Sequence, residues 1–325
     1  MMLDIIVPHY KEPWSEVRKL FDMLALQRAV SFDNFRVLLV NDGGQCKITE
    51  DVFRQGYPYE VIGLEIEHQG VSAARNYGLK KSRAEWVMFC DCDDTFSSIY
   101  SLRSILDVLG TQDYDMLWMP FYVECSVHQN RQIRERYNGL FIHGKIFRRS
   151  FLEEHHLRFS TELDFSEDTA FLSLVSMEIG QGRIGEIKSE APMYVWTFRP
   201  GSATTDPERM YSNSVGLFRR QLYVIQEYRK RDMWEDADRL CIRALCDAYI
   251  TLSRKDFAQD HTEFAQEVKR FCQKEVGHLN IDAKTLQLAM AGAITESGVS
   301  KLYVPKVDGF YGWVEEMGVN SNGSH

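Results

Sequence analysis

Short apolar runs alternate with helical patterns through the first third of the chain. Residues 5–7 (IIV) and 37–40 (VLLV) are continuously apolar, as in strands that are buried on both faces, and Pro8 is expected to end the first of them. Between these runs, the apolar residues of 17–24 have the spacing of one helix face. The alternation continues with expected strands at 59–67 and 85–91 and expected helices at 70–82 and 97–110. This order predicts a mostly parallel α/β sheet with helices on both faces.

The pattern changes after the first third. Residues 114–125 (YDMLWMPFYVEC) are interpreted as one more apolar strand, and the pattern is then mixed to about residue 210. From Ser214 onwards, apolar residues recur at helical spacing without strand signals between them. We therefore expect an α/β domain over 1–210, a helical domain over 211–320 and a disordered tail at 321–325.

Composition narrows the class of protein. The chain has 38 Lys and Arg against 47 Asp and Glu, a net charge of −9, which argues against a large nucleic-acid footprint. Seven cysteines at irregular spacing do not form a disulfide framework and favour a reducing compartment. The first residues lack a basic region and a long apolar run, and no stretch approaches the length of a membrane helix. We expect a cytoplasmic protein.

Carboxylates follow the four apolar residues 86–89, in the sequence CDCDD. If the strand persists through Asp93, then Asp91 and Asp93 share one face and Cys90 and Cys92 share the other. Two carboxylates at the carboxyl end of a strand form a hard oxygen site that suits Mg²⁺ or Mn²⁺. The alternative is an acidic turn that only ends the strand, with Asp94 as turn or N-cap residue.

Two other segments place polar side chains at the ends of elements. Asp42 follows the second strand and is followed by Gly43 and Gly44, which allow a tight loop. Its carboxylate could accept hydrogen bonds from a ligand, although an ordinary Asp-Gly turn explains the same letters. Arg75 and Asn76 begin a helix, where they could face an anionic ligand or remain solvated.

A later acidic pair stands at another expected helix start. Ser166 has the position of an N-cap, so that Glu167 and Asp168 fall in the first turn, where the helix dipole favours the ionised form that a general base needs. Acids in first turns also stabilise helices without any catalytic role. His143 and Lys145 are weaker signals, and a single histidine in such a place is more often structural than catalytic.

The order of these segments is more specific than any one of them. IIVPHYKE, VLLVNDGG, GVSAARNYGL, EWVMFCDCDD, HGKIFRRSFLEEHHLRF and SEDTAFL occur in the order found in family 2 glycosyltransferases, which the chain resembles over about residues 1–205. The resemblance implies a GT-A fold, a Rossmann-like, mostly parallel sheet flanked by helices, and the use of nucleotide-diphosphate sugars.

The resemblance also implies a role for each matching position. Asp42 resembles the acid that reads the nucleobase, usually uracil, beside the loop of Pro8 and Tyr10. Arg75 and Asn76 resemble the element that lies near the base and the diphosphate.

The acidic segments match the catalytic part of the family pattern. Asp91 and Asp93 resemble the acidic pair at the metal site of the family. Asp93 matches the acid that binds the divalent metal, and Asp91 matches the acid that contacts the ribose or the sugar. Asp168 resembles the catalytic base, with Glu167 beside it in the acceptor site. The less specific matches, implied as phosphate or acceptor contacts, are Lys145, Arg199 and Ser202.

The expected function is metal-dependent, inverting transfer of a sugar from a UDP-sugar to an acceptor hydroxyl, with Mn²⁺ or Mg²⁺, in bacterial cell-surface glycan or polymer synthesis. The expected acceptor is a glycan, a polymer or a lipid-linked saccharide, with the helical domain as acceptor-binding or oligomerisation part. A homo-oligomer and a peripheral position at the inner membrane face both stay open. The alternatives are a phage-type enzyme that glycosylates modified DNA and a non-catalytic module that binds nucleotide sugars. A nucleotidyltransferase is disfavoured, because PHYKEPW lacks the glycines of its phosphate loop.

Overall fold

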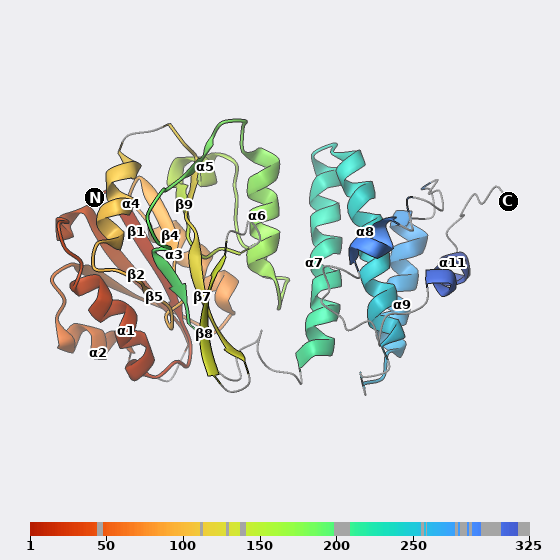
Figure 1. Cartoon of the computed structure of the whole chain (residues 1–325), viewed down its shortest axis with the longest axis horizontal. Helices are drawn as coiled ribbons and strands as arrows, with labels where there is room; N and C mark the ends of the chain where they lie inside the picture. Colours follow the sequence, from red (N-terminus) through yellow and green to blue (C-terminus); the bar gives the residue numbers. More distant parts are fainter. Residues whose placement is uncertain are drawn as a thin grey trace. The chain divides into compact units, whose positions relative to one another are not determined.

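The structure, a computed structural model, contains two compact units, Met1–Arg199 and Pro200–His325 (Figure 1). It describes residues 1–43, 48–110, 113–127, 130–136, 141–197, 209–254, 257, 259–276, 279, 285, 288–293 and 307–317.

Seven of the described strands form the main sheet of the first unit, in the order β10-β6-β9-β4-β1-β2-β3. β9 runs antiparallel to its neighbours β4 and β6, and the other pairs run parallel. The sheet is therefore mostly parallel, as predicted. The strands are β1 (Leu3–His9), β2 (Phe35–Asp42), β3 (Glu60–Ile66), β4 (Trp86–Phe89), β6 (Met116–Trp118), β9 (Lys145–Arg148) and β10 (Ile184–Glu186).

Helices cover both faces of this sheet, and β1 shows why. Ile5 and Val7 belong to the same buried cluster as Leu20 of α1, whereas Ile6 points to the opposite face. There a Cβ atom on Gly78 of α3 would lie only 2.4 Å from Ile6 Cγ2, so the helix packs at a distance that glycine alone permits. The helices are α1 (Trp14–Ala25), α2 (Ile48–Gln55), α3 (Val71–Lys81), α4 (Ser101–Leu109), α5 (Arg149–Glu154) and α6 (Glu167–Glu178), with a short 3₁₀ turn, η1 (Phe32–Asn34).

Pro8 does not end the first strand, contrary to the prediction. It pairs with Val40 of β2, and β1 continues to His9. The carbonyl of Ile6 accepts a hydrogen bond from Cys90 N. The backbone groups of Ile6, and of Pro8 two residues later, therefore point towards β4. Because β4 has already ended beside Pro8, the N–H that proline lacks is not needed for a bond to that strand.

A second, smaller sheet has the order β5-β11-β7-β8 and is mixed, with both antiparallel and parallel pairs. The single strand predicted at 114–125 is wrong, because the segment divides into β6 and β7 and belongs to both sheets. Pro120 stands between the two strands, where it cannot donate to a ladder. The strands of the smaller sheet are β5 (Thr95–Phe96), β7 (Phe121–Val127), β8 (Asn130–Arg136) and β11 (Tyr194–Trp196).

The second unit is helical where it is described, as predicted. Phe218 and Ile225 of α7 share a buried cluster with Cys241 and Leu245 of α8 and with Phe264 of α9, so the apolar spacing of each helix supplies one side of this core. Of the described helices, none combines the length and the apolar character that crossing a bilayer requires. The elements are α7 (Met210–Lys230), α8 (Trp234–Ser253), α9 (Thr262–Phe271), the π turn η3 (Cys272–Val276) and α11 (Val307–Glu316).

Candidate active site

The acidic segment after β4 is a tight turn. The strand ends two residues before Asp91, and Asp94 N donates a hydrogen bond of 3.1 Å to the carbonyl of Asp91. The predicted alternation, with Asp91 and Asp93 on one face of an extended strand, is therefore wrong. Both carboxylates are half-buried at the carboxyl edge of the sheet. The two cysteines of the segment, Cys90 and Cys92, are buried free thiols.

Arg75 connects this turn to the start of α6. Its guanidinium donates to Asp91 Oδ1 and to Glu167 Oε1, each at 2.8 Å, and its side chain is only 4% exposed. The helix α3 holds the arginine in place, while its two partners come from segments far apart in the sequence. The structure thus brings three of the predicted site residues together around one buried positive charge.

Asp168 lies beside this ion-pair network in the first turn of α6. Burial, together with the negative charge of Glu167, raises the pKa of Asp168 to about 6, against the opposing effects of Arg75 and the N–H of Thr169. The sequence indicated only the effect of the helix dipole and did not predict this raised pKa. Ser166 occupies the N-cap, but with a left-handed φ of 62° and without a side-chain capping bond.

Lys145 and His143 flank the same region from the start of β9. Burial lowers the pKa of Lys145 to about 8, although the charge of Asp168 opposes the shift, and its Nζ donates to the carbonyl of Phe141. Burial also lowers the pKa of His143 to about 4, so the imidazole is neutral at physiological pH. From the sequence alone, His143 is interpreted as a structural residue, and the signal for a function is its position two residues before Lys145.

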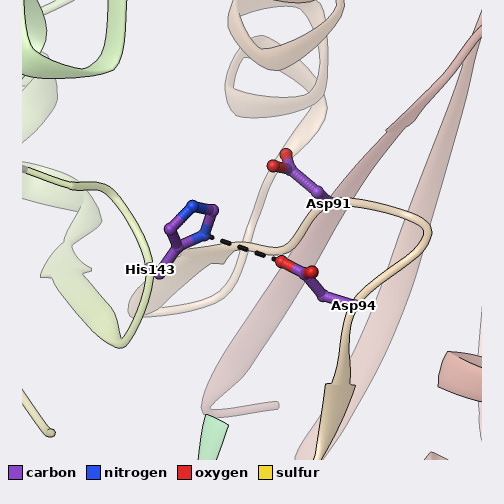
Figure 2. Close-up of side chains that lie close together, drawn as sticks. All are labelled: Asp91, Asp94 and His143. Carbon is purple, nitrogen blue, oxygen red and sulfur yellow. Dashed lines mark ion pairs between the residues drawn. The ribbon is translucent and has the colours of Figure 1, made fainter. Parts of the chain in front are cut away.

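His143 and two of the turn's acids converge on one space (Figure 2). The ligand atoms of Asp91, Asp94 and His143 all lie within 4.8 Å of one another. Asp94 is fully buried, and burial together with Asp91 and Asp93 raises its pKa well above the ordinary value. It accepts hydrogen bonds from Tyr194 Oη at 2.5 Å and from the N–H of Thr197 at 2.9 Å, and is thus more than a surface turn residue.

The ends of β1 and β2 form a second polar region at the same edge of the sheet. The carboxylate of Asp42 accepts three hydrogen bonds of 2.8 Å, from His68 Nδ1 and from the N–H groups of Gln69 and Gly70. The Tyr10 ring stacks on His68, with centroids 3.9 Å apart and planes at 6°. His68 was not singled out in the sequence, because only the folded chain brings it to both residues.

The remaining predicted contacts fall in different places. Asn76 does not present its amide to this edge: its Nδ2 donates to the carbonyl of Phe159 at 2.8 Å, and the N–H of Phe159 donates back to Oδ1 at 2.9 Å. Pro8 lies within β1. Arg199 and Ser202 lie outside the described residues.

The donor atoms in the turn suit a divalent metal ion. Carboxylate oxygens are the ligands that Mg²⁺ and Mn²⁺ prefer, and an imidazole nitrogen is also available to the heavier ion. His143 Nδ1 is buried and has no hydrogen-bond partner among the residues that the structure describes. A buried polar atom without a partner, facing two carboxylates, fits an ion between them.

Residues 4–178, more than half of the chain, match the sequence model of the family described as glycosyl transferase family 2. The chain belongs to this family. The match confirms the predicted resemblance. The matched residues of this glycosyltransferase include Arg75 and both of its partners, Asp91 and Glu167.

Two bacterial proteins are among its curated relatives. The uncharacterized glycosyltransferase EpsJ of Bacillus subtilis is 26% identical over 230 residues, which are 63% of this chain and 64% of the relative. The minor teichoic acid biosynthesis protein GgaA of the same organism is 26% identical over 209 residues, or 58% and 46%. The chain spans less than two thirds of the length of either relative.

Solved structures show the same fold. TarS of S. aureus, residues 1–349, superposes with a TM-score of 0.62 at 17% identity, over 97% of this chain and 90% of that one. A TarS structure in complex with UDP-GlcNAc gives a TM-score of 0.54 at 21% identity, over 98% and 88%. The predicted GT-A-type fold with a helical C-terminal part is confirmed.

Proposed function

We propose that this glycosyltransferase moves a sugar from a UDP-sugar to an acceptor hydroxyl, with a divalent metal ion and with inversion at the anomeric carbon. The observation that carries the proposal is the double pairing of Arg75 with Asp91 and Glu167. The buried guanidinium binds Asp91, which is expected on the donor side, and Glu167, which is expected on the acceptor side. The two sets of acids therefore lie close together. Transfer requires these two sets of groups to be close together.

Asp91 and Asp93 are the proposed ligands of the metal ion. When bound there, Mn²⁺ or Mg²⁺ would neutralise the charge that develops on the departing diphosphate. Both side chains are half-buried, so their oxygens are accessible to an ion and to a nucleotide. Arg75 holds Asp91 in a fixed position from the protein side.

Asp168 is the proposed general base. As the acceptor oxygen bonds to the anomeric carbon, Asp168 takes the hydroxyl proton, and the bond from that carbon to the diphosphate breaks with its electron pair leaving on UDP. A pKa of about 6 makes the carboxylate a stronger base than an exposed Asp and still leaves it mostly ionised near pH 7. A single displacement of this kind inverts the configuration.

Tyr10, Asp42 and His68 are the proposed nucleobase region. The stacked pair of Tyr10 and His68 offers an aromatic face beside the ends of β1 and β2, and in open α/β sheets ligands bind at such strand ends. The hydrogen bonds from the 68–70 loop fix the carboxylate of Asp42 there. TarS structures in complex with UDP and with UDP-GlcNAc are similar to this chain in fold and support a uridine nucleotide as donor.

We propose a cell-surface glycan or polymer as the acceptor, because the relatives include a protein named for teichoic acid biosynthesis. The proposed phosphate or acceptor contacts are Lys145, Arg199 and Ser202. For the helical domain predicted over 211–320, we propose a role in acceptor binding or in oligomerisation. The cytoplasmic placement stays a prediction. A DNA acceptor and a non-catalytic module stay as the alternatives that turnover must exclude.

The test is UDP release from a panel of UDP-sugars, with Mn²⁺, with Mg²⁺ and with EDTA. The proposal predicts release from one sugar that stops in EDTA and in Asp93→Ala. When a teichoic-acid-like polymer and modified DNA are added separately, only the polymer should accelerate release. Release that is indifferent to EDTA, or the absence of release together with a lack of UDP binding, would contradict the proposal.

A further inference from the structure

His143 has an unusual environment for a histidine of the protein core. Its side chain is buried, with the residue only 7% exposed, yet Nδ1 makes no hydrogen bond to any residue that the structure describes. Asp94 Oδ2, a carboxylate atom that faces it, is 3.6 Å away, which is beyond hydrogen-bond distance. Buried nitrogens of structural histidines are normally hydrogen-bonded. This one points at an acid without bonding to it.

The carboxylate of Asp94 has hydrogen-bond donors other than His143. One of its oxygens accepts from the Tyr194 hydroxyl and the other from the N–H of Thr197. The ion pair of His143 and Asp94 is therefore a poor description of the contact, because the two atoms are 3.6 Å apart and the acid already has donors. A third group that binds both side chains explains the arrangement better.

Aromatic neighbours fix the direction of the imidazole. The His143 ring stacks near Tyr194, with centroids 5.7 Å apart and planes at 23°, and near Trp196, at 5.6 Å and 19°. A ring packed against two larger rings has little freedom to turn Nδ1 towards another partner. Figure 2 shows the result: the imidazole and the carboxylate of Asp94 face each other across the space that Asp91 borders.

We infer that His143 Nδ1 and Asp94 are further ligands of the metal ion proposed above on Asp91 and Asp93, and that the imidazole makes the site prefer Mn²⁺ to Mg²⁺. The inference rests on the proposed metal-dependent function and extends it to the identity of the ion. Ligands of an octahedral ion with bonds of about 2.1 Å lie about 3 Å apart when adjacent and about 4 Å apart when opposite. The 3.6 Å between His143 and Asp94 needs only a small adjustment to meet this geometry. Imidazole favours transition metals, whereas Mg²⁺ prefers oxygen ligands and water.

The test measures the ion directly, on the full-length protein with UDP present. Free Mn²⁺ is followed by electron paramagnetic resonance to obtain its Kd, Mg²⁺ is measured by competition, and pulsed spectra report nitrogen coupled to bound Mn²⁺. In the wild type we expect a nitrogen coupling that changes when histidine is labelled with ¹⁵N. In His143→Gln and His143→Phe we expect its loss, Mn²⁺ binding weaker by about tenfold or more, and Mg²⁺ binding changed far less.

Two comparisons separate ligation from folding. His143→Phe keeps a stacked ring, so equal thermal unfolding of this variant and the wild type without metal shows that the packing is intact. His155→Gln is the matched control, since His155 Nδ1 lies 3.1 Å from Glu178 in the same unit, and it should bind Mn²⁺ like the wild type.

The failure of the inference and the failure of the proposed function give different results. Tight Mn²⁺ binding without nitrogen coupling, or with coupling that survives in His143→Gln, would overturn His143 as a ligand and leave metal-dependent transfer standing. A wild type that binds neither Mn²⁺ nor Mg²⁺ in the presence of UDP would overturn both.

Discussion

Arg75 and Asp91 form an ion pair of 2.8 Å between α3 and the turn after β4, and the second arm of the same guanidinium reaches Glu167, 92 residues further along the chain. Burial opposes the charge on the arginine, but Asp91 and Glu167 outweigh it and raise the pKa of Arg75 above its ordinary value. The position of the acidic turn is therefore linked to the position of the first turn of α6. A change in the arginine should affect both stability and catalysis.

Arg75→Met is the first variant to examine. It keeps the bulk of the side chain but leaves two carboxylates without their shared partner, so we expect the free energy of unfolding to fall by about 3 kcal/mol. Turnover should fall by about 100-fold or more, because the fixed position of Asp91 is lost. Urea unfolding and UDP release measure the two effects. In the control Arg103→Met, which removes an exposed pair with Asp107, the loss should be about 0.5 kcal/mol or less. Equal losses in the two variants would show that the Arg75 network does not hold the site.

The pH dependence of kcat/KM should report the two shifted groups. Asp168 must be ionised to accept a proton, so activity should fall as pH drops below about 6, the value to which burial and Glu167 raise the pKa of this acid. Lys145, whose pKa burial lowers to about 8, should lose its charge above that pH and with it the contact to an anionic substrate. Lys145→Arg should move the alkaline limb to higher pH and leave the acid limb unchanged. An acid limb near pH 4 would exclude Asp168 as the titrating base.

Asp168→Asn should make the protein more stable while removing its activity. The raised pKa means that the folded state binds a proton more tightly than the unfolded chain, whose Asp titrates near 3.8. Stability from this group is therefore present at low pH and is lost as pH rises from about 4 through 6. Asparagine mimics the neutral form, so the variant should gain on the order of 2–3 kcal/mol above pH 7 and little at pH 4. Melting temperatures over this range measure the difference. A variant no more stable than the wild type at pH 8 would contradict the burial of a charged Asp168.

Tyr10→Ala should weaken nucleotide binding without affecting the chemical step. Loss of one aromatic face against a base costs about 1–3 kcal/mol, or about tenfold or more in the Kd of UDP. Calorimetric titration with UDP and Mn²⁺ measures it. Tyr100→Ala, at a tyrosine that is 55% exposed, is the matched control and should bind like the wild type. Unchanged UDP affinity in Tyr10→Ala would place the base elsewhere.

The sequence was sufficient where local pattern decides structure. Continuous apolar runs such as residues 5–7 are short and rich in β-branched residues, which indicated buried strands, and the helical spacing over 17–24 indicated the buried face of α1. The fold class and the family followed from the order of such segments. Two of the errors fell at prolines: Pro8 was tolerated because β4 had ended beside it, and Pro120 divided one predicted strand into two.

The candidate site was predictable only in part. The sequence marked Asp91 and Glu167 separately, but nothing in it joined them through one arginine. His143 and Asp94 were interpreted as structural or turn residues, since their convergence depends on how β9 lies beside β4. The raised pKa of Asp168 likewise depends on burial by distant segments, whereas sequence position showed only the helix dipole.

The direct test of Asp168 as the base is the rate of sugar transfer at saturating donor and Mn²⁺ in Asp168→Asn, with UDP affinity measured on the same protein. We expect a rate lower than in the wild type by about 10³-fold or more, with UDP bound as tightly as before. Transfer within tenfold of the wild-type rate, by a variant that folds and binds UDP, would show that another group takes the proton of the acceptor.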